Sequence, residues 1–178
     1  MNVGLSLMRR VPPAVAMGRV LSALADATAR AAGVPAPRLR GSGEIQCEQY
    51  ALFSRACVTE ALARGTAGEL THALRGEAWA LGDRLRALAG IATVTEGLAV
   101  AARLYALIGI EFQADPDGRI HVSRCCFSRF YSPTVCGVMS AMDEGVLAGL
   151  TGEGRLSFTR RITEGHPACT GRFAWCGP

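Results

Sequence analysis

Apolar residues recur at helical spacing through most of the first 108 residues of the chain. This spacing predicts four helices, over residues 14–32, 45–64, 67–88 and 96–108. Near residue 110 the pattern changes to an alternation of apolar and polar positions around a turn rich in Asp, Pro and Gly, which indicates a β-hairpin. The elements expected from there on are strands 110–114 and 119–125, a helix over 133–150, and strands 155–163 and 169–176.

This order of elements, helices followed by ββαββ, is typical of an α+β fold in which helices cover one face of a small antiparallel sheet. A chain of 178 residues fits one domain with a core of normal size. We therefore expect a single domain over residues 1–178. It would have a helical part, 1–108, and a ββαββ part, 109–178, that carries the functional site.

All basic side chains of the chain are arginines, because the sequence contains no lysine, and the net charge is +4. The absence of lysine excludes Schiff-base chemistry and a phosphate-binding-loop lysine. The arginines are spread along the chain and only 6% of residues are aromatic. The sequence therefore offers neither a basic stripe nor a stacking platform, and we expect no nucleic-acid partner. An Ala-rich composition without lysine is also typical of a bacterial-type, GC-rich genome.

A short apolar run follows Arg9 and Arg10, but Pro12, Pro13 and Arg19 interrupt it. The sequence therefore predicts neither a signal peptide nor a membrane span, and we expect a cytoplasmic protein without a membrane partner. Thiols stay reduced in that compartment. The odd number of seven cysteines also speaks against a disulfide framework. The cysteines are thus expected to be buried, metal-bound or reactive.

Reactive side chains are concentrated in the last third of the chain. Five of the seven cysteines and two of the three histidines lie there, namely Cys125, Cys126, Cys136, Cys169 and Cys176 with His121 and His166. The two upstream cysteines, Cys47 and Cys57, are ten residues apart on one predicted helix and do not share a face. We interpret both as core packing.

Periodicity predicts which of these side chains point inward. Alternation along strand 119–125 puts His121 and Cys125 on one face. On the following helix, Cys136 and Asp143 are seven residues apart and share a stripe with apolar residues. Cys169 shares a strand face with aromatic residues. We therefore expect Cys125, Cys136 and Cys169 to converge with His121 and Asp143.

An arginine falls among the apolar positions of strand 155–163, where Leu156, Phe158 and Ile162 alternate as on a core face. If Arg160 is buried there, it needs a partner or an anionic ligand, because an uncompensated buried charge costs several kcal/mol. Asp143 is the structural candidate for this partner. A bound carboxylate is the functional alternative, because a guanidinium group matches its geometry in a bidentate pair.

Three kinds of chemistry fit the converging set. A cysteine thiolate would act as nucleophile, activated by His121 and with Asp143 orienting the base. Alternatively, the cysteines would hold zinc together with His121 or Asp143, although no Cys-x-x-Cys pair marks such a site. In the third reading the cysteines line an apolar ligand pocket. The spacing leaves these alternatives open, so the cofactor is unassigned, with zinc as the candidate.

A longer pattern in this segment resembles the L-2-amino-thiazoline-4-carboxylic acid hydrolase family over about Gly109 to Trp175. The residues that carry the resemblance are His121, Cys125-Cys126-Phe127, Cys136, Asp143, Phe158-Thr159-Arg160, Gly165 and Cys169. The resemblance implies ring-opening hydrolysis of a small cyclic amidine or thiazoline carboxylate to an N-carbamoyl amino acid, by a hydrolase acting on a non-peptide C–N bond. It implies substrate binding by Arg160 and Phe158, a nucleophile or metal ligand among Cys125, Cys136 and Cys169, and proton transfer by His121 and Asp143.

The same segment is also similar to vinyl-reductase-type small-molecule-binding domains. In these, a helix with small residues precedes a hairpin that closes in Gly-x-x-x-Cys, a pattern that Gly165 to Cys169 fits. This similarity implies a sensor for aromatic or other apolar ligands, with zinc in some members. We therefore expect a small-molecule hydrolase, with a non-catalytic binding or sensor domain as the alternative. The Gly- and Ala-rich helical half makes a homodimer a further expectation.

Overall fold

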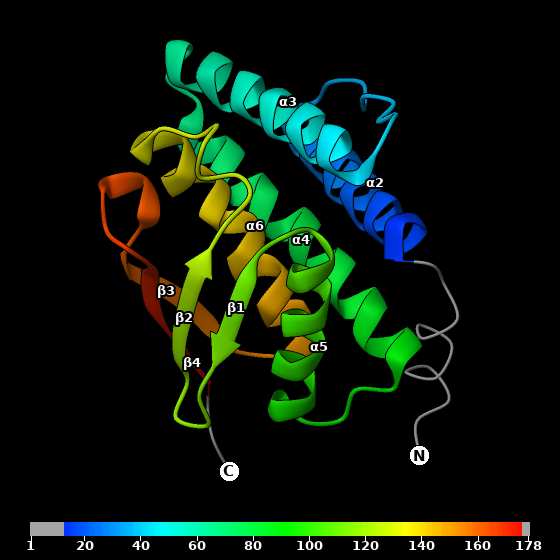
Figure 1. Ribbon diagram of the computed structural model, residues 1–178. Coiled ribbons are helices and arrows are strands. Elements are labelled where there is room, and N and C mark those ends of the chain that lie inside the picture. The colour runs from blue at the N-terminus through cyan, green and yellow to red at the C-terminus, as the bar shows by residue number, and fades with distance from the viewer. Residues whose placement is uncertain (1–12, 176–178) are drawn as a thin grey trace.

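The computed structural model describes residues 13–175 and has the expected α+β architecture, with helices first and ββαββ after them (Figure 1). The elements are α2 (Pro13–Ala32), α3 (Gly43–Ala63), α4 (Ala67–Ala89), α5 (Val94–Leu107), β1 (Glu111–Ala114), β2 (Arg119–Arg124), α6 (Pro133–Thr151), β3 (Arg155–Arg160), the 3-10 turn η1 (Ile162–Glu164) and β4 (Cys169–Ala174). Arg9, Arg10 and the first two residues of the apolar run after them, together with Cys176 at the end of the last predicted strand, lie outside the described residues, whereas the run continues as the start of α2.

The four strands form one antiparallel sheet in the order β1-β2-β4-β3. Strand alternation gives the sheet one buried face, to which Phe112, Ile120, Val122, Leu156 and Phe173 contribute. This face joins the apolar side chains of the helices in a single core. The opposite face is open to solvent, as the prediction of helices on one side of the sheet requires.

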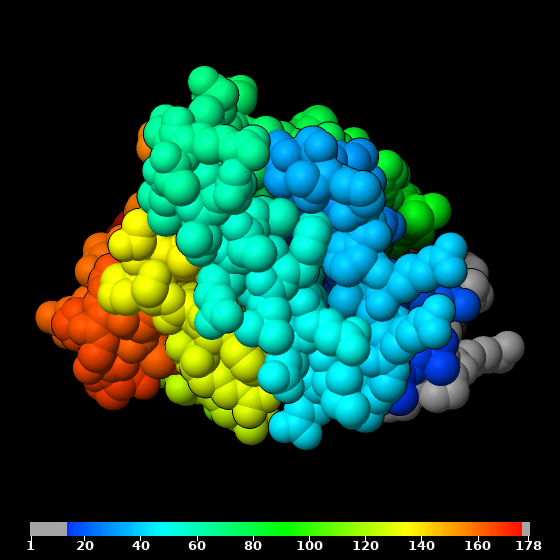
Figure 2. Space-filling view, turned by 90° about the horizontal axis from the view of Figure 1, so that it is seen from above, coloured from blue at the N-terminus to red at the C-terminus, as the bar shows by residue number. Residues whose placement is uncertain are grey.

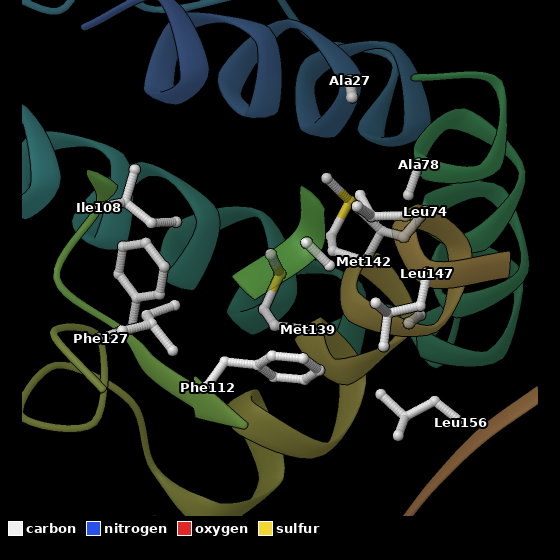
Figure 3. Close-up of a cluster of buried hydrophobic side chains, with 14 of the residues drawn as sticks. Ala27, Leu74, Ala78, Ile108, Phe112, Phe127, Met139, Met142, Leu147 and Leu156 are labelled. Carbon is white, nitrogen blue, oxygen red and sulfur yellow. The ribbon is translucent and has the colours of Figure 1, made fainter. Parts of the chain in front are cut away.

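The centre of the core lies around α6, whose Met139, Met142 and Leu147 meet side chains from α4 and from the sheet (Figure 3). Leu147 and Leu150 are completely buried. No single helix among residues 13–175 has the length and apolar character needed to cross a membrane. The α4–α5 pair meets that criterion only jointly, across a bend of 108°, and on length and composition alone.

The most extensive contact between two helices joins α4 and α6. At this contact the two backbones touch through glycines. A Cβ atom added to Gly82, Gly145 or Gly149 would lie well inside van der Waals contact of backbone atoms on the opposite helix. Interiors are packed too densely to absorb such an atom without movement. The three glycines therefore set the distance between α4 and α6.

Local signals explain where the site-bearing helices begin. The hydroxyl of Thr93 accepts a hydrogen bond from the Glu96 backbone N–H at 3.2 Å, and the Glu96 carboxylate accepts one from the Thr93 N–H at 3.1 Å. This capping box begins α5 two residues before the predicted start at residue 96. Ser132 caps α6 by accepting from the Val135 N–H at 3.2 Å, with Pro133 in the first turn.

Strand β3 differs from its prediction at its end. The expected strand over 155–163 stops at Arg160, and η1 follows. The pairing register of β3 with β4 shifts between Phe158 and Arg160, which reverses the alternation of faces beyond that point. Arg160 is consequently exposed, and Arg161 takes the inward direction. The prediction that Arg160 lies on the core face is therefore wrong.

Candidate functional site

A cavity of about 760 Å³ is lined by residues from all five helices of the described part of the chain and from the segments that follow β2 and β3. Its lining is mostly aliphatic, with side chains such as Val20, Leu24, Leu81, Leu85, Leu104, Met139, Met142 and Val146. Cavities of this size and character are typical of small-molecule sites. The residues that the sequence predicts to be reactive are therefore expected to line this cavity.

Part of the lining, which includes Asp143 and three cysteines, is shared with a second, smaller cavity of about 60 Å³. The residues that line both are Tyr105, Ile110, Cys125, Cys136, Ser140, Asp143 and Cys169. The smaller cavity extends from this group toward the sheet, where Phe158 and Arg161 complete it. Four of the side chains predicted to converge, those of Cys125, Cys136, Cys169 and Asp143, therefore do lie around one space.

Asp143 is the acidic group of the cavity lining. Its Oδ1 accepts a hydrogen bond of 2.8 Å from the Tyr105 hydroxyl, which is the one hydrogen bond to this carboxyl within residues 13–175. Burial raises the pKa of Asp143 to about 6, while the Tyr105 hydrogen bond and the charge of Arg161 act in the opposite direction. Burial, followed by the negative charge of Asp143, raises the pKa of Tyr105 well above its usual value. Tyr105 is therefore a neutral donor, and Asp143 titrates close to physiological pH.

The three cavity cysteines are neutral thiols at physiological pH. Burial raises the pKa of Cys125 to about 12, and it also raises the pKa values of Cys136 and Cys169. The negative charge of Asp143 adds to the shift in each case. Because the thiolate is the nucleophilic form, a raised pKa works against covalent catalysis by these residues. Their environment is closer to that of apolar packing.

His121 lies away from this cavity, on the exposed side of the sheet. It faces Gln113 on β1 and Thr170 on β4. Alternation along β2 is as predicted up to Arg124, but the strand ends there and Cys125 turns into the cavity. The expectation that His121 and Cys125 share a face is therefore wrong. Asp143 was the candidate structural partner of Arg160, and this pair is not formed, because Arg160 is exposed.

Arg161 occupies the inward position that strand alternation predicts for Arg160. Its Nε donates to the Ser140 hydroxyl at 3.3 Å, and one terminal nitrogen lies 3.4 Å from the Glu164 carboxylate. The guanidinium group also lies 5.5 Å from the centre of the Phe158 ring. The doubled arginine was visible in the sequence, but only the register shift in β3 decides which of the two faces inward.

All three tyrosines of the chain line the cavity, although none entered the sequence-based site. Tyr50 lies 3.2 Å from the Thr28 hydroxyl, and Tyr131 lies 2.6 Å from that of Ser54. The ring of Phe127 contacts Tyr50 edge to face and stacks on Tyr131. Tyr50 and Tyr105 come from the helical half, whereas the predicted site residues all lie in the ββαββ half. A polar aromatic side chain in helices made mostly of Ala and Leu was the available signal.

Metal ligation receives no support from the geometry. Within residues 13–175, no three His, Cys, Asp or Glu side chains form a group that could hold a metal ion. The cavity cysteines and Asp143 therefore line a space without forming a preorganised zinc site. Neither a protein-family model nor a curated protein matches the chain. Functional assignment consequently depends on the cavity itself.

Proposed function

We propose that this protein binds a largely apolar small molecule in the cavity of about 760 Å³ between its helices and the segments after β2 and β3. The observation that carries the proposal is a space of about 760 Å³ with a mostly aliphatic lining and one carboxyl in its wall. Apolar surface drives the binding of such a ligand, while a few placed polar groups orient it. The neutral thiols of Cys125, Cys136 and Cys169 suit contact with an apolar ligand, because their sulfur atoms in the cavity wall are polarizable.

The polar groups indicate what the ligand would present. Asp143 uses one oxygen for Tyr105, which leaves the other as an acceptor for a donor on the ligand. The Thr163 hydroxyl is a further polar group of the lining, and it contacts the Cys136 thiol. We therefore propose an apolar ligand that carries an amine or hydroxyl group, which would donate to Asp143.

An apolar fluorescent probe tests this proposal. N-phenyl-1-naphthylamine is expected to bind saturably with enhanced emission, and Ala23→Phe should weaken its binding about tenfold, because the added ring fills cavity space needed by the probe. Ala23 is half-buried in the cavity wall on α2, whereas Ala14 is exposed on the same helix. Ala14→Phe is the matched control. Emission that does not saturate, or equal affinities in the two variants, would contradict the proposal.

Hydrolysis of a small cyclic carboxylate is the second candidate, in line with the family resemblance. The observation in its favour is a carboxyl group with a pKa of about 6 in the same small cavity as an arginine. In this scheme Asp143 takes the proton of an attacking water, and Arg161 holds the substrate carboxylate. Water is the better nucleophile to propose here, because the cavity thiols are neutral.

The adjacent arginines allow a matched test of hydrolysis. If 2-amino-thiazoline-4-carboxylate is a substrate, Arg161→Met should lower kcat/KM at least about a hundredfold through loss of the charged partner. Arg160→Met, one residue away and exposed, should leave turnover unchanged. Chromatography of the N-carbamoyl product measures both rates. Absence of turnover in the unmodified protein would contradict the hydrolase proposal. An equal loss of activity in the two variants would also contradict it.

A further inference from the structure

Two cysteines outside the cavity lie directly against each other. The Sγ atoms of Cys47, on α3, and Cys126, just after β2, are 2.9 Å apart although the residues are separated by 79 positions in the sequence. Cys47 is buried and Cys126 is half-buried. A disulfide requires an S–S distance of about 2.05 Å. The two sulfur atoms are therefore close to bonding distance before any reaction.

The surrounding contacts hold these two sulfur atoms in place. Residues 125–131 lie along α3, and Figure 2 shows the two segments side by side at the surface. On one side of the cysteine pair, the Tyr131 hydroxyl lies 2.6 Å from that of Ser54. On the other side, Arg129 lies 3.8 Å from the Glu44 carboxylate. The segments that carry the two cysteines are thus aligned by contacts other than the thiols.

The two thiols also differ in acidity. The pKa of Cys47 is lowered, chiefly because the Cys126 thiol hydrogen-bonds to it, and the positive charge of Arg129 adds to this effect. The same contact raises the pKa of Cys126, and burial raises it further. The shift lowers the pKa of Cys47, whereas burial raises the pKa values of the cavity cysteines. A thiolate beside a protonated thiol is the arrangement that oxidation of a dithiol requires.

We propose that Cys47 and Cys126 form a redox-active pair that hydrogen peroxide converts to a disulfide. The Cys47 sulfur attacks one peroxide oxygen, the O–O bond breaks, and the departing hydroxide takes up a proton to give water and a sulfenic acid. The Cys126 sulfur then attacks the Cys47 sulfur, the S–O bond breaks, and the second water leaves with the Cys126 proton. The two thiols lose two electrons and two protons, and the peroxide is reduced to two waters.

The disulfide would join two walls of the cavity. Cys126 stands between the cavity residues Cys125 and Phe127, and Tyr50 lines the cavity one turn after Cys47 on α3. A covalent bond between α3 and this segment would restrict their separation and slow ligand exchange. This consequence rests on the proposed binding function, whereas formation of the disulfide does not. The two are therefore measured separately.

Peptide mapping of the full chain tests the disulfide. After treatment with hydrogen peroxide and alkylation without reductant, trypsin releases residues 41–55 and 125–129, because it cleaves after arginine. We expect these two peptides to be linked, with two hydrogens fewer than their sum, and to separate after reduction. Recovery of both peptides alkylated and unlinked would overturn the proposal.

Cysteine variants decide which thiol of the second peptide reacts, since it contains Cys125 and Cys126. Cys126→Ala should lower the linked fraction at least about tenfold, whereas Cys125→Ala should leave it unchanged. Cys126 is half-buried, so its replacement perturbs packing less than replacement of the buried Cys47. Linkage lost in Cys125→Ala but retained in Cys126→Ala would contradict the assignment. Probe dissociation before and after oxidation then reports on the cavity separately.

Discussion

Replacement of Gly149 by alanine is expected to destabilise the fold by about 3 kcal/mol, the upper part of the range for overpacking a core. The added Cβ would collide with the Trp79 carbonyl oxygen and lie 2.7 Å from the Asp83 nitrogen and 2.9 Å from the Gly82 Cα. All three are backbone atoms of α4, so no side-chain rotation relieves the contact. Relief requires α4 and α6 to separate along their shared surface.

Gly137 provides the matched control, because it lies on the same helix but an added Cβ would meet nothing within 4 Å. Gly137→Ala is expected to stabilise the protein by about 0.5–1 kcal/mol, the helix preference of alanine over glycine. Urea unfolding followed by circular dichroism measures both changes. Equal stabilities in the two variants would mean that the helices do not approach as closely as the glycine contacts require.

The close approach of these helices also shapes the candidate site. α4 supplies Leu81 and Leu85 to the cavity wall, and α6 supplies Met139 and Asp143. A change in the α4–α6 distance therefore moves two walls relative to each other. Gly149→Ala should consequently weaken probe binding even at temperatures where the variant remains folded, because cavity shape follows helix spacing.

The order of helices and strands was predictable because apolar residues recur along the chain at clear helical or strand spacing. Long Ala- and Leu-rich stretches with glycine ends specify the helices, and the turn with Gly118 specifies the hairpin. The structure departs from the predicted element bounds and faces where a single residue changes the local backbone geometry. Thr93 begins α5 early through its capping box, and the register shift at Thr159 reverses the faces at Arg160 and Arg161. Alternation alone cannot anticipate a bulge, because a bulge depends on the partner strand.

The candidate site was predictable only within single elements. Cys136 and Asp143 share a helical stripe, and both line the cavity. Contacts between residues of distant elements could not be predicted, because the apolar pattern of one helix does not indicate which other helix packs against it. Tyr105, 38 positions before Asp143, is such a partner, and Cys47, 79 positions before Cys126, is another. Both pairs are created by the packing of α3 and α5 against the second half of the chain.

Asp143→Asn is expected to stabilise the fold by up to about 3 kcal/mol above pH 7 and by almost nothing below pH 4. The folded-state pKa of about 6 lies above the ordinary value of 3.8, and each pKa unit corresponds to about 1.36 kcal/mol. Because the pKa is raised on folding, the protonated acid is favoured in the folded state. The stability it contributes is fully present below pH 4 and is lost as the pH rises through 6. Asparagine mimics the protonated form and keeps an acceptor for Tyr105.

Unfolding in urea at pH 4, 6 and 8, compared between Asp143→Asn and the unmodified protein, isolates this group from the other carboxylates. Asp26→Asn, at an exposed site on α2, is the control for loss of an aspartate outside the cavity. A protein that maintains a destabilising carboxyl in a cavity wall is expected to use it, because such groups trade stability for function. Asp143→Asn should therefore lose affinity for an apolar amine at pH 8 while it gains stability, since a neutral amide cannot pair with the ammonium group. A pH-independent stability difference would show that Asp143 is ionised without penalty and would remove the basis for its role in binding.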